Sequence, residues 1–312
     1  MSDSREPDKQ DLKMQIEKSG KPLEIVVSSL LDKYKWKSVT NTDTFVDREE
    51  GKLRDIDICA SRDDLLPRIG NLQLETYLTL ECKNDPGKAW IFFTRPFKFN
   101  VVDIAGQYID EIQMATRNTE NVEIMEMILK KSRLHYENDA FKNVAVTYDR
   151  VFLHPPKNYD PQRENQRGKK RKNHLLEAIS QLKKYIDWAM DQEVRKRSQV
   201  LPYTIEMYFP CIVFQGYMYE ATVKENGEVE LERRNHILLR TLYRSPYSVY
   251  EKGILIDVIC DSPFSEKRFS DYNELVCRDM ESLKEVLTQN SDEIGQRITG
   301  TLELIESTRR GE

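Results

Sequence analysis

The chain has 312 residues, with 48 Lys and Arg against 53 Asp and Glu, so its formal net charge is −5. Hydrophobic residues make up 39% and charged residues 32%, which predicts a hydrophobic core beneath a heavily charged surface. The 12 Gly and 12 Pro exclude collagen-like and low-complexity classes, and 15 Tyr, 11 Phe and 3 Trp argue against wholesale disorder. We therefore expect a soluble globular protein.

Cysteine use and the N-terminal sequence indicate the compartment. The five cysteines are scattered without CxxC spacing, which indicates neither a disulfide framework nor a thiolate zinc site. The N-terminal stretch MSDSREPDKQDLK is polar and does not resemble a secretory signal. The longest apolar runs, such as GILIDVIC, have the length of a strand and are far shorter than a membrane span. These features predict a cytoplasmic protein that does not bind membranes.

The N-terminal part is predicted to form a helix followed by a strand meander. Residues 1–20 are polar and predict a flexible leader. Residues 21–31 predict a helix with Pro22 in its first turn. Its apolar residues have helical spacing and predict one buried stripe: Leu23, Val26, Val27, Leu30 and Leu31. Short strands are predicted at 36–39, 44–46, 54–60, 76–83 and 89–94, with a turn at 47–51.

The rest of the chain alternates between helical and strand-like patterns. Helices are predicted at 101–136 and 174–194, and strands at 144–153, 203–209, 211–219, 221–231 and 254–260. Asn226-Gly227 predicts a hairpin turn, and Asp271 is expected to cap a C-terminal helix that runs past Leu304.

This order of elements predicts an α+β or mixed α/β sandwich, in which a mixed central sheet is flanked by helices. We expect a leader at 1–20, one domain over 21–262 with a helical insertion at about 101–172, and a C-terminal helical region at 263–312.

Four charged residues on these elements predict a common site. Glu81 and Lys83 are two residues apart on a strand, so both leave the face opposite Leu80 and Cys82. Asp57 alternates in the same way with isoleucines on the preceding strand. Charged residues on apolar strands are costly unless they are paired or bind a cation. Two adjacent strands would bring Asp57, Glu81 and Lys83 into one pocket, towards which Glu24 can lean from its helix.

The residue types in this pocket suit a hard cation. Carboxylate oxygens select Mg²⁺ or Mn²⁺ over zinc, and Mg²⁺ needs only one or two protein carboxylates because it keeps several waters. Such an ion neutralises charge that develops on a phosphate and lowers the pKa of a bound water. A neighbouring lysine can orient that water and help to deprotonate it.

The pattern Glu24, Asp57, Glu81-Cys82-Lys83 resembles the PD-(D/E)XK, or restriction-endonuclease-like, nuclease superfamily, and is similar in particular to its Mrr-type members. Ile56 stands where the family motif has proline. The resemblance covers about residues 20–95 and implies a restriction-endonuclease-like core. It also implies a Mg²⁺- or Mn²⁺-dependent deoxyribonuclease with Asp57 and Glu81 as metal ligands, Lys83 as the water-activating residue and Glu24 as an accessory acid.

Two further features bear on nucleic-acid binding. The segment RENQRGKKRK, residues 163–172, has six basic residues and one acidic residue, and it is either a phosphate-binding segment or a solvated loop. Its candidate contacts are Arg167, Lys169, Lys170, Arg171 and Lys172. Gln181 and Tyr185 match the QxxxY motif of RecB-type relatives, which implies contacts with DNA. One such active site cuts one strand, so a double-strand break would need two sites, for which a homodimer is a candidate assembly.

Alternatives remain open from the sequence. The four charged residues are either a metal site or an ion-pair cluster, and the fold without catalysis would leave an inactive nucleic-acid-binding or scaffold protein. A glycosidase would also need paired acids, but has no use for Lys83. Asp55 could ligate in place of Asp57, although a rim position paired with Arg54 or Lys52 is the preferred interpretation. Asp257 and the four isolated histidines are interpreted as structural.

Overall fold

The structure is a computed structural model that describes residues 8–47, 50–62, 72–96, 131, 134, 143–153, 174–197, 203–244 and 251–296. Its elements in chain order are α1 (Lys9–Lys18), α2 (Lys21–Lys33), β1 (Lys37–Asp47), β2 (Lys52–Arg62), β3 (Leu72–Pro96), β4 (Asn143–Phe152), α7 (His174–Arg197), β5 (Tyr203–Val223), β6 (Val229–Arg233), β7 (His236–Arg244), β8 (Glu251–Asp261) and α8 (Glu266–Gln289). Among these residues, none of the helices combines the length and the apolar character that a membrane span requires.

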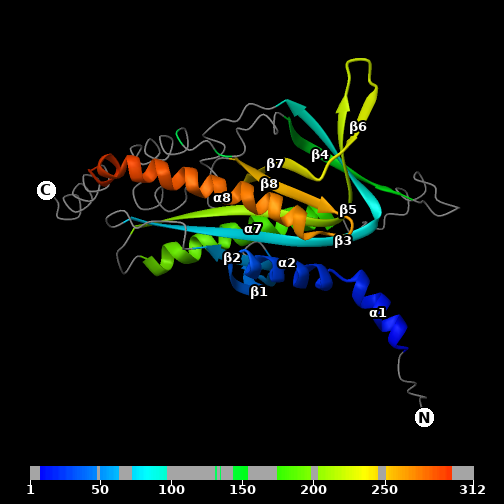
Figure 1. Cartoon of the computed structure of the whole chain (residues 1–312), viewed down its shortest axis with the longest axis horizontal. Helices are drawn as coiled ribbons and strands as arrows, with labels where there is room; N and C mark the ends of the chain where they lie inside the picture. Colours follow the sequence, from blue (N-terminus) through cyan, green and yellow to red (C-terminus); the bar gives the residue numbers. More distant parts are fainter. Residues whose placement is uncertain are drawn as a thin grey trace, which may run out of the picture.

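The leader predicted over residues 1–20 contains a helix that was not predicted from the sequence. Residues Lys9–Lys18 form α1, and the carboxylate of Asp8 caps the helix by accepting the N–H of Gln10 at 2.9 Å. Figure 1 shows α1 projecting from the body of the protein, and the side chains described on it are exposed. A helix that buries no face lacks the apolar periodicity by which helices are found in a sequence, which explains the error.

The helix predicted after the leader is confirmed as α2. Proline stands in its first turn, and Leu23, Val27 and Leu31 are buried. Val26 is the exception to the predicted stripe, because 45% of it is exposed. The stripe that packs against the sheet is therefore narrower than predicted.

The described strands form one mixed eight-stranded sheet, which confirms the α+β or mixed α/β class. β3 is antiparallel to β2 and parallel to β5, and its second half is antiparallel to β4. β5 also pairs with β8, and β8 pairs with β7. β7 pairs with β4 through Ala145 and Leu239, so the series of pairings returns to β3. The strand β3 thus lies at the centre of the architecture, which places its side chains between the helical layers.

Several strand boundaries differ from the prediction. The strands predicted at 36–39 and 44–46 are one strand, β1, and those at 76–83 and 89–94 are one strand, β3. β3 pairs with β5 on both sides of a register shift between Asn84 and Ala89. Tertiary pairing across a polar stretch is not visible in local sequence. For the same reason β5 is a single strand where separate ones are predicted, and β7 is not predicted at all.

Helices cover both faces of the sheet. On one face, α2 packs on β3 and α8 packs on β8, and the shared core of this face includes Val27, Leu80, Phe269 and Val276. On the other face, α7 packs through Leu182 and Ile186 against residues that include Phe45, Ile56, Trp90 and Phe214. Figure 1 shows α8 running along the sheet. Both α2 and α7 contact β2 and β3, the two strands that carry the predicted site residues.

The C-terminal helix α8 begins earlier than predicted, and it ends at Gln289 and not beyond Leu304. Ser265, not Asp271, caps α8, since its hydroxyl accepts the N–H of Arg268 at 3.3 Å. α7 is confirmed over His174–Arg197, and the hairpin turn at Asn226-Gly227 is confirmed between β5 and β6. The basic segment 163–172, the segment around Leu304, and residues 101–136 other than Lys131 and Leu134 lie outside the described residues.

Candidate metal centre at the end of the β2–β3 ladder

The paired residues of β2 and β3 end at Ile58 and Leu80, and the next positions on the two strands are Asp57 and Glu81. Beyond this point the side chain of Asp57, and not a backbone carbonyl of β2, accepts a hydrogen bond from β3. Its Oδ2 accepts the backbone N–H of Cys82 at 2.8 Å. A carboxylate that accepts a backbone N–H satisfies a donor that would otherwise lack a strand partner. The structure therefore holds the Asp57 carboxylate against the strand that carries Glu81 and Lys83.

Glu81 and Lys83 lie on the same face of β3, as the alternation predicts. Glu81 is fully buried, whereas the side chain of Lys83 is 16% exposed. Lys83 Nζ lies 2.5 Å from Glu81 Oε2 and 3.5 Å from Asp57 Oδ2. The structure thus brings together three of the four predicted site residues in one partly buried ion-pair group.

Burial controls the ionisation of this group. It raises the pKa of Glu81 to about 8, because removal from water disfavours the charged carboxylate; Lys83 opposes this shift and Asp57 adds to it. Burial lowers the pKa of Lys83, but the charges of Glu81 and Asp57 outweigh it, so the pKa is raised overall. Lys83 is therefore an ammonium, whereas burial disfavours the charged form of Glu81 below about pH 8.

One oxygen of this group is left over. Glu81 Oε1 is buried and has no hydrogen-bond partner among the described residues. A buried carboxylate oxygen without a partner is unfavourable, so this atom is suited to a water or a cation. It is the feature of the structure that best fits a ligand at this place.

Glu24 lies at the margin of the same group, in the first turn of α2. It is 9% exposed, and its Oε2 accepts a hydrogen bond from Lys21 Nζ at 2.7 Å. A Cβ added at Gly20 would lie 3.6 Å from both Glu24 Oε1 and the carbonyl oxygen of Cys82, so the start of α2 faces β3. The hydrogen bond to Glu24, and then the charges of Asp57 and Asp55, raise the pKa of Lys21.

Lys21 was missed by the sequence analysis. It forms part of the charged margin, but one lysine among the many basic residues of this chain carries no distinguishing local signal. Its position opposite Glu24 follows from helical i, i+3 spacing, whereas its proximity to Asp57 depends on packing of α2 against β3.

The donor set is small for a protein metal site. Within the described part of the chain, no group of three or more His, Cys, Asp and Glu side chains is arranged to hold a metal ion. The available donors are the carboxylates of Asp57 and Glu81. Two carboxylates fit Mg²⁺ or Mn²⁺, because such ions keep several waters and take oxygen ligands.

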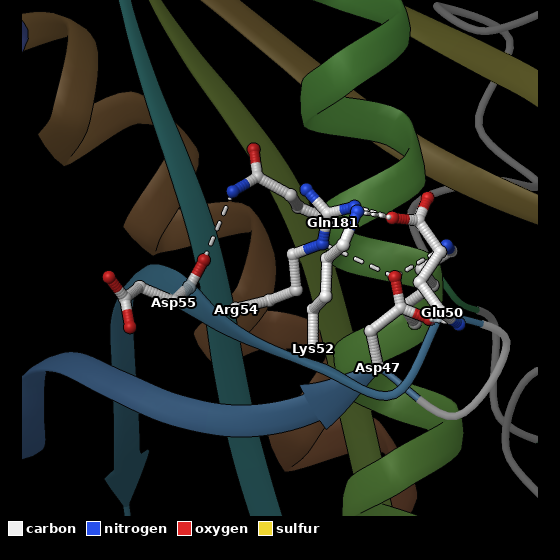
Figure 2. Close-up of polar contacts among 7 residues, drawn as sticks. Asp47, Glu50, Lys52, Arg54, Asp55 and Gln181 are labelled. Atoms are coloured by element: carbon white, nitrogen blue, oxygen red, sulfur yellow. Dashed lines mark hydrogen bonds and ion pairs between the residues drawn. The ribbon is translucent and has the colours of Figure 1, made fainter.

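Gln181 and Tyr185 connect α7 to the β1–β2 hairpin through hydrogen bonds. Gln181 Nε2 donates to the backbone carbonyl of Asp55 at 3.1 Å (Figure 2), and the hydroxyl of Tyr185 donates to Asp43 Oδ2 at 2.9 Å. Burial, together with the neighbouring Cys59 and Asp43, raises the pKa of Tyr185 far above its ordinary value. Both side chains thus hold the hairpin beside the site.

The predicted pairing of Asp55 is wrong. Arg54 pairs with Asp47 and Glu50, and Lys52 pairs with Glu50, as Figure 2 shows, while the carboxylate of Asp55 is exposed and accepts the hydroxyl of Thr44 at 3.0 Å. Arg54 pairs with Asp47 and Glu50 because the turn between β1 and β2 brings these two acids close to the start of β2. Asp47 is fully buried and also accepts a bond from Lys184 Nζ at 2.7 Å, a contact that no local pattern predicts.

A second buried carboxylate lies on β8. Asp257 is fully buried, with Oδ1 at 2.8 Å from His236 Nε2 and Oδ2 accepting the hydroxyl of Tyr272 at 3.4 Å. His236 has no motif partner in the sequence, but in the fold it contacts this carboxylate. The network ties α8 to β7 and β8, and the pairing of His236 opposite Ile259 explains why sequence spacing did not reveal it.

Comparisons of the chain with models of protein families, with curated proteins and with solved structures each find no match. The resemblance to the nuclease superfamily therefore rests on Glu24, Asp57, Glu81 and Lys83 and on the elements that carry them.

Proposed function

We propose that this protein is a Mg²⁺- or Mn²⁺-dependent nuclease that hydrolyses phosphodiester bonds in DNA, in restriction, defence or repair. The observation that carries the proposal is the group formed by Asp57, Glu81 and Lys83 where β2 and β3 cease to pair. Two carboxylates and one ammonium, contributed by two neighbouring strands, are the residue types that metal-dependent phosphodiester hydrolysis requires.

In this proposal Asp57 and Glu81 hold the ion. Glu81 Oε1 supports this role because it is buried without a partner among the described residues. When bound, a divalent ion would neutralise charge on the scissile phosphate and lower the pKa of a water. The bond from the Cys82 N–H holds the carboxylate of Asp57 in place beside the strand that carries Glu81.

Lys83 and Glu24 have supporting roles in the proposal. The ammonium of Lys83 would orient the attacking water and stabilise negative charge in the transition state. Glu24, whose Oε2 lies 2.7 Å from Lys21 Nζ, would contribute negative charge at the margin of the site. Arg167 to Lys172 are proposed to bind phosphates along the substrate, and α7, which follows this segment, packs beside the site.

A second candidate is a nucleic-acid-binding protein of the same fold without catalysis. The observation that favours it is that no set of three or more ligating side chains is arranged for a metal among the described residues. The intact Asp57, Glu81 and Lys83 favour the enzyme, because a binding protein has no need for a buried carboxylate at this position.

The test is incubation of the purified full chain with labelled plasmid DNA in Mg²⁺, in Mn²⁺ and in EDTA. The nuclease proposal expects cleavage with either ion and none in EDTA. Binding without cleavage under all three conditions would favour the inactive protein. Cleavage that persists in EDTA and in variants of Asp57 would contradict the metal site.

A further inference from the structure

A lysine side chain fills the space between the two proposed metal ligands. Lys83 Nζ is bonded to Glu81 Oε2 at 2.5 Å and lies 3.5 Å from Asp57 Oδ2. The ammonium therefore faces one oxygen of each carboxylate. These two oxygens are contributed by the two neighbouring strands β2 and β3.

A bridging ion and this ammonium exclude each other. Ligand oxygens approach Mg²⁺ to about 2.0–2.1 Å, so an ion bound to both of these oxygens would overlap with a Lys83 head group in its present position. Glu81 Oε1 has no hydrogen-bond partner among the described residues, and Lys83 does not block it. A cation can thus engage Asp57 Oδ2 and Glu81 Oε2 together only after Lys83 has left them.

The burial of Glu81 explains why Lys83 takes this position. A fully buried carboxylate without a counter-charge is strongly unfavourable, and Lys83 supplies that charge from the same strand. A divalent ion would supply a larger counter-charge and would repel the ammonium. The lysine stem is flexible and the side chain is 16% exposed, so the head group can rotate towards solvent without disturbing the strand.

We propose that Lys83 is the resident counter-ion of this site and is exchanged for the divalent ion. This inference rests on the metal-dependent function proposed above. In the metal-free protein, Lys83 is paired with Glu81 and Asp57 and is withheld from substrate. In the metal-bound protein, Lys83 is released towards the reacting groups. Metal binding would then release the lysine at the same time, so the site would stay unreactive until the ion is present.

The first test measures where the amine of Lys83 is. The wild-type full chain is treated with a small amine-acetylating ester in EDTA and in saturating Mg²⁺, and the modification of each lysine is followed by peptide mass spectrometry. We expect the rate at Lys83 to rise about fivefold or more in Mg²⁺. Lys88 is the matched control, because it lies on the same strand, is 20% exposed and lies 3.7 Å from Asp85; its rate should not change.

The second test measures competition directly. Calorimetric titration with Mn²⁺ should give an affinity about fivefold or more tighter for Lys83→Met than for wild type, and an unchanged affinity for Lys88→Met. Bound metal with an unchanged rate of Lys83 acetylation in the wild type would overturn the exchange and leave the nuclease proposal standing. If folded Lys83→Met binds Mn²⁺ as tightly as the wild type or more weakly, the exchange is likewise overturned and the nuclease proposal stands. Failure of the wild type to bind either ion would remove both proposals.

Discussion

The carboxylate of Asp57 accepts the backbone N–H of Cys82 at 2.8 Å, across the point where β2 and β3 stop pairing. Cys82 is the residue between Glu81 and Lys83, so this one hydrogen bond sets the separation of Asp57 from both of them. It also gives Asp57 a structural role beside the proposed catalytic one, which affects how its variants must be chosen.

Loss of the charged groups should abolish cleavage without unfolding the protein. We expect Lys83→Ala and Asp57→Asn each to lower the rate of plasmid cleavage about 100-fold or more. Asn is used at position 57 because its side-chain oxygen can still accept the Cys82 N–H, whereas Ala would leave that donor unpaired. Circular dichroism checks folding and Lys88→Ala serves as the control; full activity in either folded variant would remove the nuclease assignment.

The basic segment should contribute to affinity without sequence preference. If Arg167, Lys169, Lys170, Arg171 and Lys172 bind phosphates, replacing them by Gln should weaken binding to all DNA sequences about equally. The slope of log affinity against log salt should flatten by about one for each phosphate that is no longer neutralised. Fluorescence anisotropy over a salt series measures this slope. An unchanged slope would identify the segment as a solvated loop.

A divalent ion should stabilise the wild type through Glu81. Ligand at about a hundredfold excess over its dissociation constant adds about 2.7 kcal/mol to the free energy of unfolding. Glu81→Gln removes one carboxylate ligand with little change in shape, so its melting temperature should respond much less. Thermal melting of both proteins in EDTA and in Mn²⁺ measures the difference. Equal shifts in the two proteins would place the ion elsewhere.

The raised pKa of Glu81 makes stability depend on pH. Its pKa rises from 4.5, the ordinary value, to about 8 in the folded protein, because burial disfavours the carboxylate. The folded state therefore binds this proton more tightly than the unfolded state. The stabilisation is complete below the ordinary pKa and is lost as the pH rises towards and through about 8.

In EDTA, the free energy of unfolding contributed by Glu81 should therefore fall between about pH 5 and pH 8. Glu81→Gln should show a flatter curve over this range, and the difference between the two urea-denaturation series isolates the carboxyl group from other titrating residues. Lys83 does not contribute to this slope, because its pKa is raised above 10.5. Parallel curves for the two proteins would contradict the assignment.

The buried Asp257 should be a structural residue. Asp257→Asn weakens the charge-assisted bonds to His236 and Tyr272 that join α8 to the sheet, so we expect a loss of about 1–3 kcal/mol in the free energy of unfolding. Asp271→Asn is the control, since Asp271 is 52% exposed and its pair with Arg268 at 3.4 Å lies on the surface. Equal stability of the two variants in denaturant titrations would show that the network is dispensable.

Local pattern in the sequence accounts for much of the site. The period of two along β3 places Glu81 and Lys83 on one face, and the helical period of α2 buries Leu23 and Val27 beside Glu24. These relationships follow from backbone geometry over a few residues, so they can be predicted from the residues themselves. The mixed α/β class follows in the same way from the order of elements.

Other features depend on contacts between residues that are distant in the chain. Pairing of β3 with β5 makes one strand out of two apolar segments, and packing of α2 against β3 brings Lys21 near Asp57. The end of the β2–β3 ladder exposes the Cys82 N–H that Asp57 accepts, and the burial of Glu81 draws Lys83 between the carboxylates. These features arise only in the folded chain, because hydrogen-bond pairing and removal from water depend on which distant segments meet, and no local spacing records that.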